Sequence, residues 1–114
     1  MNPIGRHLIL DFWGCDARVL GDVAILEEAL VRAATAADAH VVKRVMHAFL
    51  PHGVTGMLLL AESHLSIHTW PEEGYAAIDF YTCGPGDPTR SEGPLVDVLR
   101  PTRIERQSIA RGVR

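Results

Sequence analysis

Three apolar segments follow one another in the middle of this chain with only short connections between them. They span residues 54–61, 65–70 and 75–83, and each is rich in residues that favour strands. The connections hold three and four residues. Parallel strands need a crossover of roughly a dozen residues or more, so these segments are predicted to be antiparallel neighbours in one sheet.

Three further segments are strand candidates on either side of this centre. Residues 6–12 alternate between apolar and polar side chains, which is typical of a strand with one buried face. Residues 41–49 and 102–109 have the composition of strands. The sequence therefore predicts a sheet of five or six strands.

Two helices are expected to pack on this sheet. Asp22 can cap a helix that runs to about Ala37, with apolar residues at steps of three and four. A second helix is expected around Pro94 to Leu99. The sum is an α+β fold, a two-layer α/β sandwich with a mostly antiparallel sheet and two helices on one face. The other face would stay uncovered in a single domain of 114 residues, so we expect a homodimer.

Charge and hydropathy exclude two classes of partner. Lys and Arg number 11 against 14 Asp and Glu, a net charge of −3, whereas phosphate binding needs a concentrated basic surface. No apolar run reaches the ~18 residues of a membrane helix. We therefore expect neither nucleic acid nor a membrane as partner, and a small molecule as substrate.

The two cysteines differ in their surroundings. Cys15 and Cys83 are far apart in a chain whose start lacks the pattern of a secretory leader, so we expect free thiols and a cytoplasmic location. Cys15 is interpreted as structural. Cys83 ends a strand candidate beside Gly84, where a thiol can reach a ligand and act as a proton donor.

The pair Glu62-Ser63 is the candidate for unusual backbone chemistry. It lies in the short connection between two strand candidates, where the peptide can be held under strain. A serine can attack the carbonyl of its own preceding peptide bond, which cuts the chain and can leave a pyruvoyl group. The alternative is a serine that merely caps a strand, because a motif as short as this dipeptide often occurs by chance.

His68 is the candidate general acid or base near this pair. It shares one strand parity with His64, Ser66 and Trp70, so this strand presents a polar face. Histidine titrates near neutrality and can transfer protons. Thr55 and Ser66 supply further hydroxyl groups. The alternative is an ordinary face turned to solvent.

A metal site is a weaker alternative. Its possible ligands are His47, His52, His64, His68, Cys83 and Glu62. No paired-cysteine or helical zinc motif is present, and the spacing of the two strand histidines would suit a helix rather than a strand. We therefore expect no metal.

The run ESHLSIHTWPEEGYAAIDFYTCG at residues 62–84 resembles the core of the short prokaryotic S-adenosylmethionine decarboxylases. Residues 5–8 through 15–16, and Phe49-Leu50-Pro51 with residues 53–56, resemble the same family. The resemblance extends from about Gly5 to Gly112. A match of this length is far more specific than the Glu62-Ser63 dipeptide alone.

This resemblance implies a self-processing enzyme. Cleavage between Glu62 and Ser63 would leave a β chain of residues 1–62 and an α chain of residues 63–114, with Ser63 becoming the pyruvoyl cofactor. That carbonyl would form a Schiff base with the substrate amine and accept the electrons released by decarboxylation. His68 would assist the elimination that follows the acyl shift, and Cys83 would protonate the decarboxylated carbon.

The resemblance also implies a substrate site and an assembly. Phe49 and His68 match positions that enclose the adenine, and Glu72 matches one that binds the ribose. Trp70 is a further candidate for substrate binding. Family members form (αβ)₂ dimers with active sites near the interface. The product, decarboxylated S-adenosylmethionine, is the aminopropyl donor for spermidine synthesis.

One departure and several alternatives accompany this interpretation. Thr55 stands where we expect a serine that helps self-cleavage, so processing is expected to be slower. A pyruvoyl-dependent arginine or ornithine decarboxylase on the same scaffold is the nearest alternative. A non-catalytic subunit and a metal-binding module are alternatives of other classes.

Overall fold

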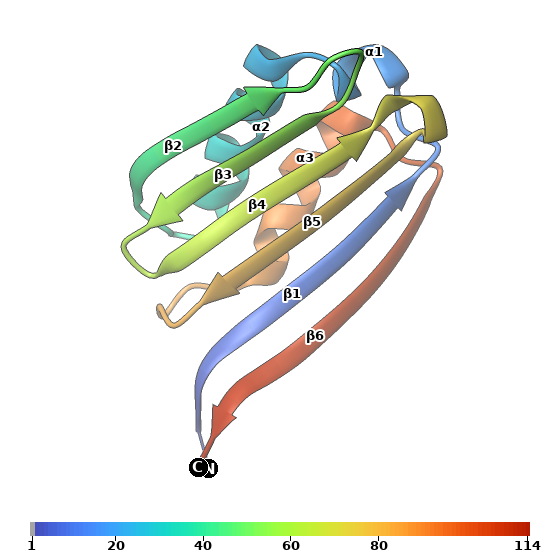
Figure 1. Ribbon diagram of the computed structural model, residues 1–114. Helices are drawn as coiled ribbons and strands as arrows, with labels where there is room; N and C mark the ends of the chain where they lie inside the picture. Colours follow the sequence, from blue (N-terminus) through green and yellow to red (C-terminus); the bar gives the residue numbers. More distant parts are fainter. Residues whose placement is uncertain (1) are drawn as a thin grey trace.

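Six strands form one antiparallel sheet in the order β2-β3-β4-β5-β1-β6 (Figure 1). This arrangement comes from a computed structural model that describes residues 2–114. The strands are β1 (Pro3–Trp13), β2 (Val41–Ala48), β3 (Val54–Leu60), β4 (Ser63–Trp70), β5 (Tyr75–Thr82) and β6 (Arg103–Val113). The three central segments are antiparallel neighbours, which confirms the prediction from their short connections.

Two helices of two or more turns, α2 (Val23–Ala36) and α3 (Glu92–Leu99), cover one face of this sheet (Figure 1). Asp22 caps α2 as predicted, because its side chain accepts the backbone N–H of Ile25 at 3.1 Å. A one-turn helix α1 (Ala17–Leu20) was not predicted. Two 3₁₀ turns, η1 (Pro71–Glu73) and η2 (Pro88–Ser91), complete the fold.

Several boundaries differ from the sequence prediction: β1 begins at Pro3 rather than at residue 6, and β6 ends at Val113 rather than at residue 109. The helix α3 begins at Glu92, two residues before the expected Pro94, because proline is tolerated in the first turn of a helix. The strand β4 begins at Ser63, two residues before the expected start. Ser63 is therefore the first residue of a central strand, and the turn that precedes it holds only Ala61 and Glu62.

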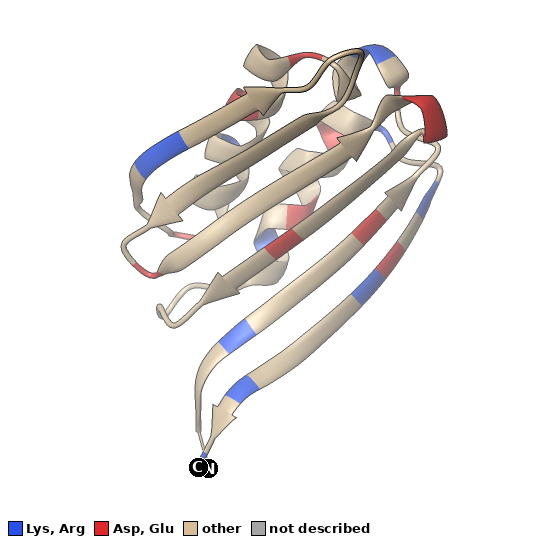
Figure 2. Cartoon of the chain, in the orientation of Figure 1, with Lys and Arg blue, Asp and Glu red and all other residues tan. Residues whose placement is uncertain are grey.

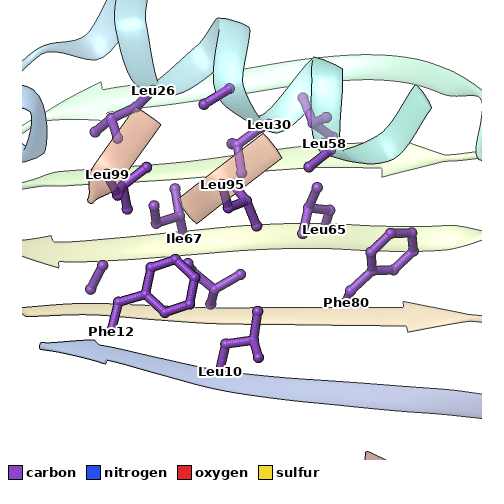
Figure 3. Packing of buried hydrophobic residues seen from close by; sticks show 14 of the residues in the cluster. Leu10, Phe12, Leu26, Leu30, Leu58, Leu65, Ile67, Phe80, Leu95 and Leu99 are labelled. Atoms are coloured by element: carbon purple, nitrogen blue, oxygen red, sulfur yellow. The ribbon is translucent and has the colours of Figure 1, made fainter. Parts of the chain in front are cut away.

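The core lies between the helices and the sheet. Leucines of α2 and α3 are fully buried against the side chains of β1, β4 and β5 that point to the same side (Figure 3). The large fully buried side chains include Leu26, Leu30, Leu95, Leu99, Phe12, Ile67 and Phe80. Truncating one such leucine to alanine typically costs about 2–5 kcal/mol, so this layer fixes the sheet as a rigid platform.

The opposite face of the sheet has no covering layer in a single copy. Five large apolar side chains on this face or at its rim are each between 38% and 54% exposed: Val45, Met57, Leu59, Trp70 and Ile109. The neighbouring strands β3 and β4 carry no Lys, Arg, Asp or Glu, as Figure 2 shows. Exposed apolar side chains on an uncovered face are typical of an interaction surface. None of the described helices is long and apolar enough to cross a membrane.

Candidate active site

The Glu62-Ser63 peptide lies at the tight turn between β3 and β4, and its backbone is strained. Ser63 has a φ of 147°, a backbone conformation that residues other than glycine rarely adopt. Such a residue costs of order 1–3 kcal/mol and persists only where its surroundings hold it. The strain expected from the sequence is therefore present at the proposed cleavage residue.

The carbonyl oxygen of Glu62 accepts two hydrogen bonds from one residue. The backbone N–H of Cys83 donates at 3.0 Å, and the Cys83 thiol donates at 3.3 Å. Cys83 reaches this position because it directly follows β5, which pairs with β4 in register Ser63–Thr82. We call Glu62, Ser63 and Cys83 the serine end of β4.

The other end of β4 borders an open cavity of about 450 Å³. Its walls include all the remaining site residues predicted from the sequence: Phe49, Thr55, His68, Trp70 and Glu72. We call these five residues the histidine end. The Thr55 hydroxyl lies 2.9 Å from Nδ1 of His68, because the two residues are cross-strand partners.

A sixth residue lies at the histidine end, and the sequence analysis named it only as a possible metal ligand. His52 lines the same cavity, and its Nε2 lies 3.0 Å from a carboxylate oxygen of Glu72. Nothing in the spacing of His52 and Glu72, twenty residues apart, signals that the fold brings them together.

The structure does not bring the two ends together within one copy. Ser63 and His68 lie five residues apart in the same extended strand, which corresponds to roughly 17 Å at ~3.3 Å per residue. Regular alternation would also place their side chains on opposite faces, although Ser63 departs from regular extended geometry. Direct proton transfer between these two residues of one chain is therefore excluded in this conformation.

A polar cluster occupies the middle of the uncovered face. Asp79 of β5 accepts hydrogen bonds from Ser66 and contacts Nε2 of both His7 and His64, at 2.7 and 3.1 Å. Burial raises the pKa of Asp79, but these hydrogen bonds outweigh it and hold that pKa below its usual range. Arg111 donates to Nδ1 of His7 at 2.9 Å. Because a guanidinium only donates, the Nε2 of a neutral His7 carries its proton and donates to Asp79.

The metal-binding alternative is not favoured by this geometry. His7, His64 and Asp79 form the one group of three possible ligands found within residues 2–114. Of the six candidates named from the sequence, only His64 belongs to it. The arrangement is that of a hydrogen-bond network, since the bond from Arg111 leaves no free lone pair on Nε2 of His7.

The two cysteines lie in contrasting surroundings, as the sequence predicted. Cys15 is buried in the core, and burial raises the pKa of its thiol to about 11. Cys83 is exposed at the serine end, beside a cavity of about 340 Å³. Only Cys83 is placed to exchange a proton with a bound molecule.

Comparisons with known proteins point to one family. A family model described as S-adenosylmethionine decarboxylase matches residues 6–112. The S-adenosylmethionine decarboxylase proenzyme of Caldanaerobacter subterraneus subsp. tengcongensis is 42% identical over 114 residues, which cover 99% of this chain and 92% of that protein. The proenzyme of the same name from Thermotoga maritima is 45% identical over 105 residues, which cover 91% of this chain and 81% of that protein.

A solved structure agrees with these sequences. The crystal structure of the adenosylmethionine decarboxylase from Aquifex aeolicus matches with a TM-score of 0.92 at 39% identity. The match covers 100% of this chain and 95% of that one.

Proposed function

The chain belongs to the S-adenosylmethionine decarboxylase family, and on that premise we propose that it cuts itself between Glu62 and Ser63 to make its own pyruvoyl group. It is an enzyme that converts S-adenosylmethionine to decarboxylated S-adenosylmethionine, the aminopropyl donor for spermidine synthesis. The relatives are named proenzymes, which supports self-processing here. The observation that carries the proposal is the pair of Cys83 donors on the Glu62 carbonyl, next to a strained Ser63.

The serine end can begin the cleavage. The Oγ of Ser63 attacks the Glu62 carbonyl carbon, and the two Cys83 donors stabilise the negative charge that develops on the carbonyl oxygen. The peptide C–N bond then breaks, which leaves an ester between Glu62 and the Ser63 side chain. Release of the strained Ser63 backbone favours this step.

The ester is then eliminated. Removal of the Cα proton of Ser63 expels the Glu62 carboxylate and leaves a dehydroalanine. Its imine tautomer reacts with water, loses ammonia and becomes the pyruvoyl group at the start of residues 63–114. A base must take that Cα proton, and we assign this role to a His68 oriented by the Thr55 hydroxyl.

Residues of both ends serve the decarboxylation. The pyruvoyl carbonyl supplies the electron sink for the carbon–carbon bond that breaks. Cys83 is exposed beside this position and returns a proton to the substrate carbon. At the histidine end, Phe49 and His68 are placed to stack on the adenine, and Trp70 adds an aromatic wall. Glu72 is placed to accept hydrogen bonds from the ribose and to favour a sulfonium cation.

A second copy of the chain is proposed to complete each site. The two ends lie at opposite ends of one strand, and the face between them is uncovered and carries exposed apolar side chains beside its polar cluster. In a two-fold symmetric dimer every contact occurs twice with the roles of the copies exchanged. An axis near the middle of β4 would place the serine end of each copy against the histidine end of the other. The proton acceptor for Ser63 would then be His68 of the partner subunit.

The rival substrates and classes are not favoured. Arginine and ornithine would leave an aromatic cavity with a ribose-binding carboxylate unused, and the comparisons name S-adenosylmethionine decarboxylases throughout. A non-catalytic subunit would not need the strained Ser63 beneath two donors. Both thiols are free, which supports the cytoplasm as the compartment.

Two measurements test this proposal. Mass spectrometry of the purified protein should find fragments of residues 1–62 and 63–114, the second without its amino group. A single uncut chain after long incubation would contradict the proposed processing. Release of carbon dioxide should then be compared for S-adenosylmethionine, arginine and ornithine, and turnover of arginine alone would overturn the substrate.

A further inference from the structure

The side chain of Glu62 is held from one side by His40, a residue with no role in the chemistry so far. His40 lies in the loop between α2 and β2. One carboxylate oxygen of Glu62 accepts the backbone N–H of His40 at 3.0 Å, and the other lies 2.6 Å from its ring Nδ1. The backbone N–H of Ala61 donates to the carbonyl of His40 at 2.9 Å. Three contacts thus join one loop residue to the turn that precedes Ser63.

Gly84 confines the same side chain from another side. A β-carbon at this position would lie 2.6 Å from Cγ of Glu62 and 3.2 Å from its Cβ. Only a residue without a side chain fits so close. The Glu62 side chain is accordingly 15% exposed, whereas that of His40 is 79% exposed. The contact therefore serves to fix Glu62 rather than to bury His40.

We propose that His40 is a positioning residue for self-cleavage, which holds the residue whose carbonyl Ser63 attacks. This inference rests on the proposed function. Glu62 is gripped at both ends, its carboxylate by His40 and its carbonyl by Cys83, so its carbonyl carbon has little freedom to move. Fixing two reacting groups in near-attack geometry accelerates a reaction strongly, and a shift of about 1 Å can cost up to ~100-fold. The same grip sustains the strain at Ser63.

The charges of the two side chains support this grip near neutral pH. The hydrogen bond and the charge of Glu62 raise the pKa of His40, and Asp38 adds to the effect. The hydrogen bonds from His40 in turn lower the pKa of Glu62. The remaining titratable group against Glu62 is the Cys83 thiol on its carbonyl. The ion pair is therefore complete between these two pKa values, and its charge is lost as pH rises through that of His40.

The experiment follows cleavage of newly made chains. Wild type, His40→Ala and His40→Asn are synthesised in a cell-free reaction, translation is stopped, and the uncut fraction is followed on denaturing gels from pH 6 to 9. Asparagine keeps a side-chain donor near the position of Nδ1 but cannot titrate. Arg32→Ala is the matched control, because it removes an exposed ion pair with Glu28 on α2. Melting temperatures of all four proteins are measured alongside.

The expected result is slower cleavage of His40→Ala by about tenfold, partial recovery in His40→Asn, and a wild-type rate for Arg32→Ala. The ratio of wild-type to His40→Asn rates should fall as pH rises through the His40 pKa. Equal rates for wild type and His40→Ala would overturn the proposal. So would equally slow alanine and asparagine variants with lowered melting temperatures and an unchanged pH profile, because a purely structural role predicts them. If wild type itself is never cut, the proposed function fails first, and the positioning role fails with it.

Discussion

The serine end and the histidine end of β4 belong to one strand, yet they are built differently. At the serine end the backbone itself is held, by two donors from Cys83 on the Glu62 carbonyl and by an unfavourable φ at Ser63. At the histidine end, side chains such as Phe49 and His68 border a cavity of about 450 Å³. In the proposed function, one end breaks a bond of the chain and the other receives the substrate.

The contrast is the basis of our proposal that a second copy completes each site. In the proposed mechanism each end lacks what the other offers, since the assigned base, His68, lies at the histidine end and the carbonyl that reacts lies at the serine end. A continuous strand cannot fold back to join them. The uncovered face between them, with its exposed apolar side chains, is the surface on which we propose that a second copy brings opposite ends together.

The largest effect is expected at the serine end itself. Ser63→Ala removes the attacking hydroxyl, so cleavage should be abolished and no pyruvoyl group should form. Mass spectrometry should find only the uncut chain of 114 residues. Ser108→Ala, on the exposed edge strand β6, is the control and should cut normally. Fragments from Ser63→Ala that break at the same bond would contradict the role of this hydroxyl.

A smaller effect is expected at the histidine end. Phe49→Ala removes one aromatic wall of the cavity, and loss of a stacking contact with a base is worth about 1–3 kcal/mol. The KM for S-adenosylmethionine should rise by about tenfold, while the chain is still cut into two fragments. Steady-state kinetics on the fully cut protein measure this. An unchanged KM would remove Phe49 from the substrate site.

A still smaller effect links the two ends. Thr55→Ser keeps the hydroxyl beside His68 but removes a methyl group that restricts its rotation. Cleavage at Ser63 should become about threefold faster, equivalent to roughly 0.6 kcal/mol of barrier. The time course of newly made protein shows the rate. A slower serine variant would contradict the idea that the methyl group hinders processing.

The smallest effect is expected from chemical labelling of the native protein, which distinguishes the two thiols without any substitution. Burial raises the pKa of the Cys15 thiol to about 11. The contribution of the buried neutral thiol to the stability of the fold is therefore complete below the ordinary thiol pKa, and it is lost as pH rises from there through the raised pKa. At pH 8 in the native state, iodoacetamide should therefore modify Cys83 alone. After cleavage the label should appear on residues 63–114 and not on residues 1–62. A label on residues 1–62 would show that the core opens around Cys15.

The sequence predicted the fold well because its signals are local. Short connections determined the antiparallel order of β3, β4 and β5, and Asp22 marked the start of α2. The start of β4 at Ser63 was missed, since a strained residue does not follow strand propensity. The turn of α1 was missed because four residues carry too little periodicity.

The site residues predicted from the sequence fall into two separate groups in the structure, the serine end and the histidine end. The sequence predicted His68 as the general acid or base near Ser63, and the extended strand keeps the two residues apart within one copy. The contacts of His40, His52 and Asp79 were not predicted, because each depends on pairing between distant segments. Such contacts leave no spacing signal in a single sequence.

The most direct test of a site built from two copies is cleavage in mixed dimers. Ser63→Ala cannot be cut, and His68→Ala has no base of its own, but in a mixed dimer Ser63 of the second variant would meet an intact His68 of the first. The two variants are co-expressed with different tags, and the dimers that carry both tags are isolated. The account predicts that His68→Ala stays largely uncut alone and is cut in these mixed dimers. A His68→Ala chain that remains uncut there, or that is cut normally alone, would contradict it.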